Sequence, residues 1–118
     1  MIVRFPGGTR LRNNLVSHAG LIFSVATSPK KSASLYKQTK LALEFLDENL
    51  SRAGASKSTI LQATVYITDI SRKEDMNRAW NEWVDRENAP QRACVGVALE
   101  GDDLVEIVVI AAKESDTD

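Results

Sequence analysis

Arg92 and Glu106 are the two residues of this 118-residue chain with the most chemistry to offer. We expect residues 92–98 and 104–112 to form neighbouring strands joined by a turn near Gly101. Alternation then places both side chains on the sheet face that points away from the helices. Charged groups on a mostly apolar face are costly unless they are paired or lie at an edge pocket.

Two interpretations of this pair stay open. The first is a structural ion pair that bridges a subunit interface. The second is a pocket for a small anion. There, Arg92 would bind a carboxylate through its planar guanidinium fork, and Glu106 would orient or activate a water molecule.

Other reactive residue types have simpler interpretations. The single cysteine, Cys94, is expected to behave as a small apolar residue, and it cannot form an internal disulfide or a multi-cysteine metal site. His18 is the sole histidine, so we expect no metal site. Asn77 is expected to be solvated or to bond across an interface, and Ser24 ends a predicted strand with no evident role.

The composition narrows the class of protein. Hydrophobic residues make up 43% and charged residues 26%, and 15 basic against 16 acidic residues give a formal charge of −1, which argues against a dedicated nucleic-acid binder. The longest apolar run, residues 107–112, is far shorter than the roughly 20 residues that span a bilayer. Residues 1–8 lack the apolar stretch typical of a secretory signal, so we expect none. We therefore expect one cytoplasmic domain over residues 1–118, with no membrane partner and no cofactor.

Hydrophobic periodicity predicts five strands and two helices. The expected strands are residues 2–5, 21–26, 60–68, 92–98 and 104–112, and the expected helices are residues 35–53 and 71–86. The order β-β-α-β-α-β-β predicts an α+β fold, with both helices on one face of a mixed sheet. The other face carries Tyr66, Val108 and Ile110 and is too apolar to remain wet. We expect identical sheets of neighbouring subunits to cover it.

Finer predictions concern turns, caps and faces. A Gly-Gly turn at residues 7 and 8 and a polar segment at 10–14 separate the first two strands. Ser71 is the expected N-cap of the second helix, and the polar tail, residues 113–118, is expected to fray. One face of the strand at 60–68 is expected to be buried, namely Leu61, Ala63, Val65 and Ile67.

A segment in the C-terminal half resembles the signature of a known family. Its residues Pro90-Gln91-Arg92-Ala93-Cys94-Val95-Gly96-Val97 are similar to the pattern Pro-x-Arg-x-x-Val-x-Val of the RidA/YjgF family of reactive-intermediate deaminases. Val105-Glu106-Ile107, followed by Ile110-Ala111, is similar to the closing strand of that family. The resemblance covers residues 21–112, and residues 56–80 resemble the YoaB-type branch.

The resemblance implies a chorismate-mutase-like fold and a homotrimer, whose sheets form a central barrel with pockets between subunits. It also implies hydrolysis of 2-imino acids, the tautomers of enamines, to 2-keto acids and ammonia without a cofactor. By position, Arg92 would bind the substrate carboxylate, Glu106 would hold the attacking water, and the backbone at Cys94 would contact the imine. Ser24 and Asn77 match further substrate-binding positions and would meet Arg92 across the interface.

The chain departs from the family pattern at three places. Where the family has a Gly-Pro-Tyr-Ser/Val-Gln segment, this chain has residues 10–15, which contain no tyrosine. Where the family has Ser-Gly-Gln, this chain has Ser24-Val25-Ala26. The family also has a glutamate two residues beyond the position of Glu106, and this chain has Val108 there. A second hypothesis is therefore a non-catalytic protein that binds small carboxylic acids or a partner enzyme in the same cleft. A third is a ribonuclease or translation inhibitor, a label that the family also carries. The acidic balance and the sole histidine weigh against it.

Overall fold

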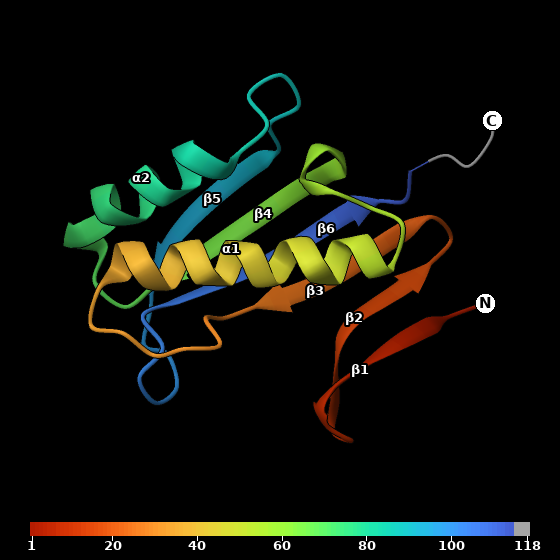
Figure 1. Ribbon diagram of the computed structural model, residues 1–118, viewed down its shortest axis with the longest axis horizontal. Coiled ribbons are helices and arrows are strands. Elements are labelled where there is room, and N and C mark those ends of the chain that lie inside the picture. The colour runs from red at the N-terminus through yellow and green to blue at the C-terminus, as the bar shows by residue number, and fades with distance from the viewer. Residues whose placement is uncertain (115–118) are drawn as a thin grey trace.

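The computed structural model describes residues 1–114, which form a six-stranded sheet with two α-helices packed on one face (Figure 1). The strands are β1 (Val3–Thr9), β2 (Arg12–His18), β3 (Leu21–Ala26), β4 (Ile60–Ile67), β5 (Gln91–Gly96) and β6 (Val105–Ala112). The helices are α1 (Leu35–Arg52) and α2 (Lys73–Trp83), with short 3₁₀ turns η1 (Lys57–Thr59) and η2 (Ile70–Arg72) before β4 and α2. The predicted α+β class is confirmed, whereas the homotrimer and its barrel stay predictions.

The sheet is mixed, with the strand order β1-β2-β3-β6-β4-β5. All neighbours are antiparallel except β4 and β5, which run parallel because α2 carries the chain back between them. Strands β1 and β5 are therefore the two edges of the sheet. We call the sheet face opposite the helices the open face.

Helix α1 follows its sequence pattern closely. Ser34 caps its first turn by accepting a hydrogen bond from the Lys37 backbone N–H. Gly54 follows its last turn with φ of 79°, a left-handed conformation that glycine adopts without strain. Its apolar stripe packs on the sheet, and the core between them includes Leu43, Leu46, Ile22, Val65 and Ile107.

The N-terminal region differs from the prediction. Residues 12–18 form strand β2, which the sequence pattern missed because Leu15 is its one buried residue and most of the others are polar. The predicted turn at Gly7 and Gly8 is also wrong, since both lie in β1 at irregular pairing with β2. A Cβ on Gly7 would lie 3.0 Å from Asn14 Oδ1, so this close crossing of strands requires glycine.

Three details of the middle elements also differ. The register between β4 and β6 shifts between Ile60 and Gln62. Leu61, which was predicted to be buried, is therefore 51% exposed, and its neighbour Ile60 is buried. Ser71 is not the N-cap of α2: that position is Arg72, which makes no side-chain capping hydrogen bond, and Asp69 instead caps the preceding turn η2 by accepting the Ser71 N–H at 3.0 Å. Helix α2 ends at Trp83, shorter than predicted.

The chain's last described residues are tied down rather than frayed. The Lys113 N–H donates to the Gly20 carbonyl at 2.9 Å, and the Glu114 N–H donates to the Gly54 carbonyl at 2.8 Å. The remainder of the predicted fraying tail, residues 115–118, lies outside the described residues. Neither helix of residues 1–114 has the length and apolar character needed to cross a membrane.

The open face is apolar, as predicted. Tyr66 and Ile110 are half-buried there, and Val108 is exposed. Neighbouring strands add further exposed apolar side chains to the same face, namely Leu21, Phe23, Val25 and Val95.

Candidate functional site

Arg92 lies on the edge strand β5 beneath helix α2, in what we call the Arg92 cluster (Arg92, Met76, Asn77 and Trp80). Its Nη2 donates to Asn77 Oδ1 at 2.9 Å, and its Nη1 lies 3.7 Å from Met76 Sδ. The guanidinium carbon lies 5.2 Å from the centroid of the Trp80 ring, a cation–π distance. No Asp or Glu among residues 1–114 forms a salt bridge with Arg92. This half-buried cation therefore has only neutral partners, a setting that favours an anion from outside.

Strand pairing decides which way Arg92 points. In the parallel ladder, Arg92 lies beside Ala63 and Cys94 lies beside Val65. Ala63 and Val65 are buried under the helices, and residues side by side in a sheet share a face. Arg92 therefore points to the helix side, and the prediction that it points away from the helices is wrong.

The other predicted site residues divide between two places. Asn77 meets Arg92 within one chain, and its Nδ2 also donates to Glu74 Oε1 at 3.1 Å. Cys94 is half-buried against the hydrophobic core. Ser24 is 5% exposed on β3, where its Oγ donates to the Asn14 carbonyl at 2.9 Å. Because β6 and β4 lie between β3 and β5, a single chain does not bring Ser24 to Arg92.

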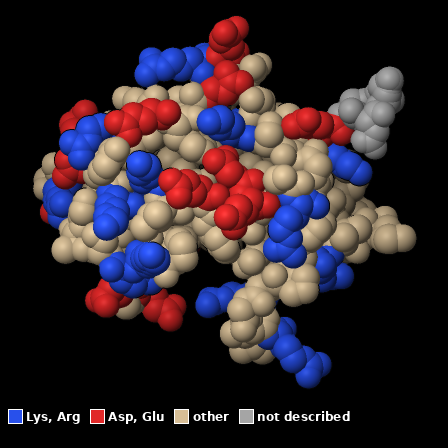
Figure 2. All heavy atoms as spheres, in the orientation of Figure 1, with Lys and Arg blue, Asp and Glu red and all other residues tan. Residues whose placement is uncertain are grey.

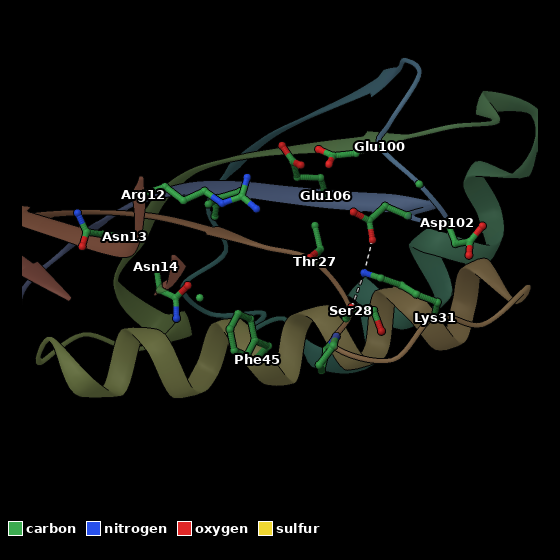
Figure 3. A pocket seen from close by; sticks show the side chains of 15 residues that line it. Arg12, Asn13, Asn14, Thr27, Ser28, Lys31, Phe45, Glu100, Asp102 and Glu106 are labelled. Carbon is green, nitrogen blue, oxygen red and sulfur yellow. Dashed lines mark hydrogen bonds and ion pairs between the residues drawn. The ribbon is translucent and has the colours of Figure 1, made fainter. Parts of the chain in front are cut away.

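Glu106 lies on the open face of β6, half-buried and paired with Tyr66 of β4. It borders a cavity of about 540 Å³ beside the β1–β2 hairpin (Figure 3). Figure 2 shows the molecule notched next to this hairpin. We call the cavity the Glu106 hollow; it is lined by residues 8, 12–14, 25, 27–29, 31, 45, 100–103 and 106.

The Glu106 hollow combines charged side chains with apolar ones, among them Val25 and Phe45. Arg12 of β2 extends across it toward Glu106 (Figure 3). On the opposite wall, Lys31 Nζ donates to the Asp103 carboxylate and, at 2.7 Å, to the Ser28 carbonyl. Among residues 1–114, no group of three His, Cys, Asp or Glu side chains is arranged to hold a metal ion. The hollow is thus equipped to hold water and polar ligand atoms.

Arg92 and Glu106 do not meet within one chain. They lie on opposite faces of the sheet, and β4 separates their strands, a spacing of about 10 Å. Glu106 is level with Val95, three residues beyond Arg92, which adds about 10 Å along the strand. The predicted pair on a shared face is therefore wrong for a single protomer.

Sequence reasoning missed some of the residues around both sites. Met76 and Trp80 are buried like ordinary core residues of α2, but they also contact Arg92. Both residues lie close to Asn77 on the same helix, and this proximity could have indicated that they belong to the same site. Arg12 gave no signal, because β2 itself was not predicted.

Comparisons with known proteins agree with this fold. Residues 3–113 match the family described as Endoribonuclease L-PSP. The chain belongs to the RidA/YjgF family. The RutC family protein YoaB of Escherichia coli is 32% identical over 112 residues, which cover 94% of this chain and 97% of YoaB. The crystal structure of NMB1025, a YjgF family member from Neisseria meningitidis, superposes with a TM-score of 0.92 at 32% identity, covering 98% and 97% of the two chains.

One further RidA/YjgF relative carries a functional name. The Escherichia coli protein named "Putative reactive intermediate deaminase TdcF" is 34% identical over 86 residues, which cover 70% of this chain and 67% of that protein. The family predicted from the Pro-x-Arg-x-x-Val-x-Val segment, and the fold it implied, are confirmed.

Proposed function

We propose that this protein hydrolyses 2-imino acids, and the enamines in equilibrium with them, to 2-keto acids and ammonia. The observation that carries the proposal is the Arg92 guanidinium, which is half-buried and has only neutral partners among residues 1–114. A substrate carboxylate would supply the missing negative charge through a bidentate pair. Membership of the RidA/YjgF family and the name of TdcF support the reaction class.

Glu106 is the proposed water-handling group. A water oxygen adds to the imine carbon while the Glu106 carboxylate accepts a proton from that water and passes it to the imine nitrogen, which gives a tetrahedral intermediate with a hydroxyl and an amino group. The hydroxyl proton then moves to the amino nitrogen, the C–N bond breaks, and ammonia leaves the carbonyl of the keto acid. Cys94 lies two residues beyond Arg92 on β5. Its backbone groups are therefore close enough to contact the imine end of a small substrate whose carboxylate is bound by Arg92.

The complete site needs two protomers. Since Arg92 and Glu106 lie on opposite faces of one sheet, one small substrate contacts both only if they come from different chains. The apolar open face, with Phe23 42% and Val108 36% exposed, supports an assembly that buries it. We therefore propose a homotrimer with a central sheet barrel and one site in each cleft.

A second candidate is a non-catalytic protein that binds small carboxylic acids or a partner enzyme. The observation that favours it is the wall of the Glu106 hollow, where Arg12, Asn13 and Asn14 stand in place of a tyrosine. Calorimetry with 2-keto acids, together with an inactive deaminase assay, would favour this candidate. A ribonuclease is disfavoured, because 15 basic and 16 acidic residues give a formal charge of −1, and acidic and basic side chains are interspersed over the face in Figure 2.

The decisive assay generates 2-aminoacrylate with a dehydratase and follows release of the keto acid. We expect the wild type to accelerate release, and Arg92→Ala to lower kcat/KM by about 100-fold or more, because a charge-assisted bidentate anchor is lost. Arg72→Ala is the matched control, since Arg72 is exposed and its salt bridge, to Asp75 at 3.5 Å, lies outside the Arg92 cluster. No acceleration by the wild type, or equal acceleration by Arg92→Ala, would refute the proposal.

A further inference from the structure

Gln38 of α1 makes an unusual set of contacts for a buried side chain. It is 0% exposed. Its Nε2 donates to two carbonyls from different loops, Ser32 at 2.7 Å and Asp102 at 2.9 Å. Its Oε1 accepts the Leu104 backbone N–H at 2.9 Å. One amide group therefore joins the loop before α1 to the turn before β6.

Both joined segments form walls of the Glu106 hollow. Thr27, Ser28 and Lys31 line it from the first loop, and residues 100–103 line it from the second. Leu104 is also held from its other side, because its carbonyl accepts the Thr68 N–H at 3.1 Å. The two walls are thus joined by the buried Gln38 amide and, nearer the surface, by the Lys31–Asp103 ion pair, while Glu106 itself is held by pairing of β6 with β4.

We propose that Gln38 is a positioning residue that sets the shape of the hollow in front of Glu106 and thereby controls turnover. This inference rests on the proposed function. Gln38 touches no part of the Arg92 cluster, so its loss leaves carboxylate binding intact and disturbs the water and polar atoms held in the hollow. Displacing polar walls by a fraction of an ångström slows a reaction that depends on orientation.

The test variant is Gln38→Met, which keeps the volume of the side chain and removes the three hydrogen bonds. We expect kcat for 2-iminopropanoate to fall by about tenfold or more, with the Kd for pyruvate unchanged within about twofold. Thr39→Val is the matched control. Thr39 is also 0% exposed, and its Oγ1 bonds only to the Leu35 carbonyl within the helix. We expect this control to lose some stability and to keep the wild-type kcat.

Gln38→Glu supplies a second readout that a purely structural role does not predict. Its carboxyl, when protonated, can donate to one carbonyl, whereas its carboxylate repels both, and burial raises the pKa of such a group. We expect kcat of this variant to fall as pH rises, relative to the wild-type profile. Gln38→Glu also tests the inference if the Gln38→Met protein does not fold.

Amide hydrogen exchange separates failure of this inference from failure of the proposed function. We expect Gln38→Met to speed exchange in residues 28–32 and 100–104 and to leave β5 unchanged. If the wild type shows no deaminase activity, the proposed function fails and exchange alone decides whether Gln38 fixes the walls. Unchanged exchange, or a folded Gln38→Met protein with wild-type kcat, would overturn the inference.

Discussion

The Arg92 cluster and the Glu106 hollow differ in the charged groups that they contain. The cluster holds one cation among neutral groups, an amide, a thioether and an indole ring. The hollow contains charges of both signs, and one of its cations, Lys31, already contacts Asp103. A lone cation with neutral neighbours gains most from an external carboxylate, whereas a cavity of mixed charges holds water and moves protons without a large net field.

Under the proposed function, this difference means that Arg92 and Glu106 belong to two half-sites that lie apart in one chain. The cluster lies on the helix side of the edge strand β5, whereas the hollow lies beside the β1–β2 hairpin and is bordered by Glu106 from the open face. Each half-site lacks what the other provides. Arg92 lies on an edge strand, and the open face is apolar. Through these two features, copies of this chain would bring the Arg92 cluster of one protomer to the Glu106 hollow of another.

Mixing variants provides the strongest test of this division. Arg92→Ala and Glu106→Gln are each expected to lose about 100-fold or more in kcat, because one removes the anchor and the other the general base. Refolding the two variants together should restore activity, since about a quarter of the clefts in random trimers combine an intact Arg92 with an intact Glu106. The coupled keto-acid assay measures the recovery.

The control for this experiment is a mixture of Arg92→Ala with the double variant that carries both changes. None of its clefts contains an intact Arg92, so no activity should return. If the first mixture also stays inactive although mass spectrometry shows mixed oligomers, the two half-sites do not act together.

A charge on the open face should weaken the assembly that joins the half-sites. Phe23→Glu places a carboxylate where an apolar side chain pairs with Ile110 on the neighbouring strand. Burial of this charge at an interface is costly, so we expect dissociation to monomers in sedimentation and about a tenfold or greater loss of specific activity on dilution. Ile70→Glu, at an exposed apolar position on η2, is the control and should leave both measurements unchanged.

The smallest expected effect concerns the support of Arg92. Asn77→Ala removes the acceptor of the Nη2 hydrogen bond. Because a hydrogen bond to a charged group is worth about 1.5 kcal/mol at the low end, we expect pyruvate to bind about tenfold more weakly. Asn81→Ala, an exposed change on the same helix, should not alter binding by calorimetry. Unaltered binding in Asn77→Ala would show that the fork is positioned by Trp80 and the strand alone.

Elements with one apolar stripe could be predicted from the sequence, and the others could not. Helix α1 and strands β3 and β6 bury alternate or helical sets of residues against a single core, so their periodicity is visible in the chain. Strand β2 buries only Leu15, and the irregular pairing near Leu61 shifts the pattern by one residue. Neither strand β2, with its single buried residue, nor the register shift produces a periodic hydrophobic pattern in the sequence.

The sequence by itself determined the family, the α+β class and the identity of Arg92 and Glu106 as chemically notable residues. Only the tertiary structure decided that these two side chains face opposite ways. Strand β5 carries small or apolar residues on both faces, and both sides of this sheet are apolar, so alternation alone could not tell one face from the other. The parallel register with β4, which sets Arg92 beside the buried Ala63, is a long-range contact, and it fixed the choice.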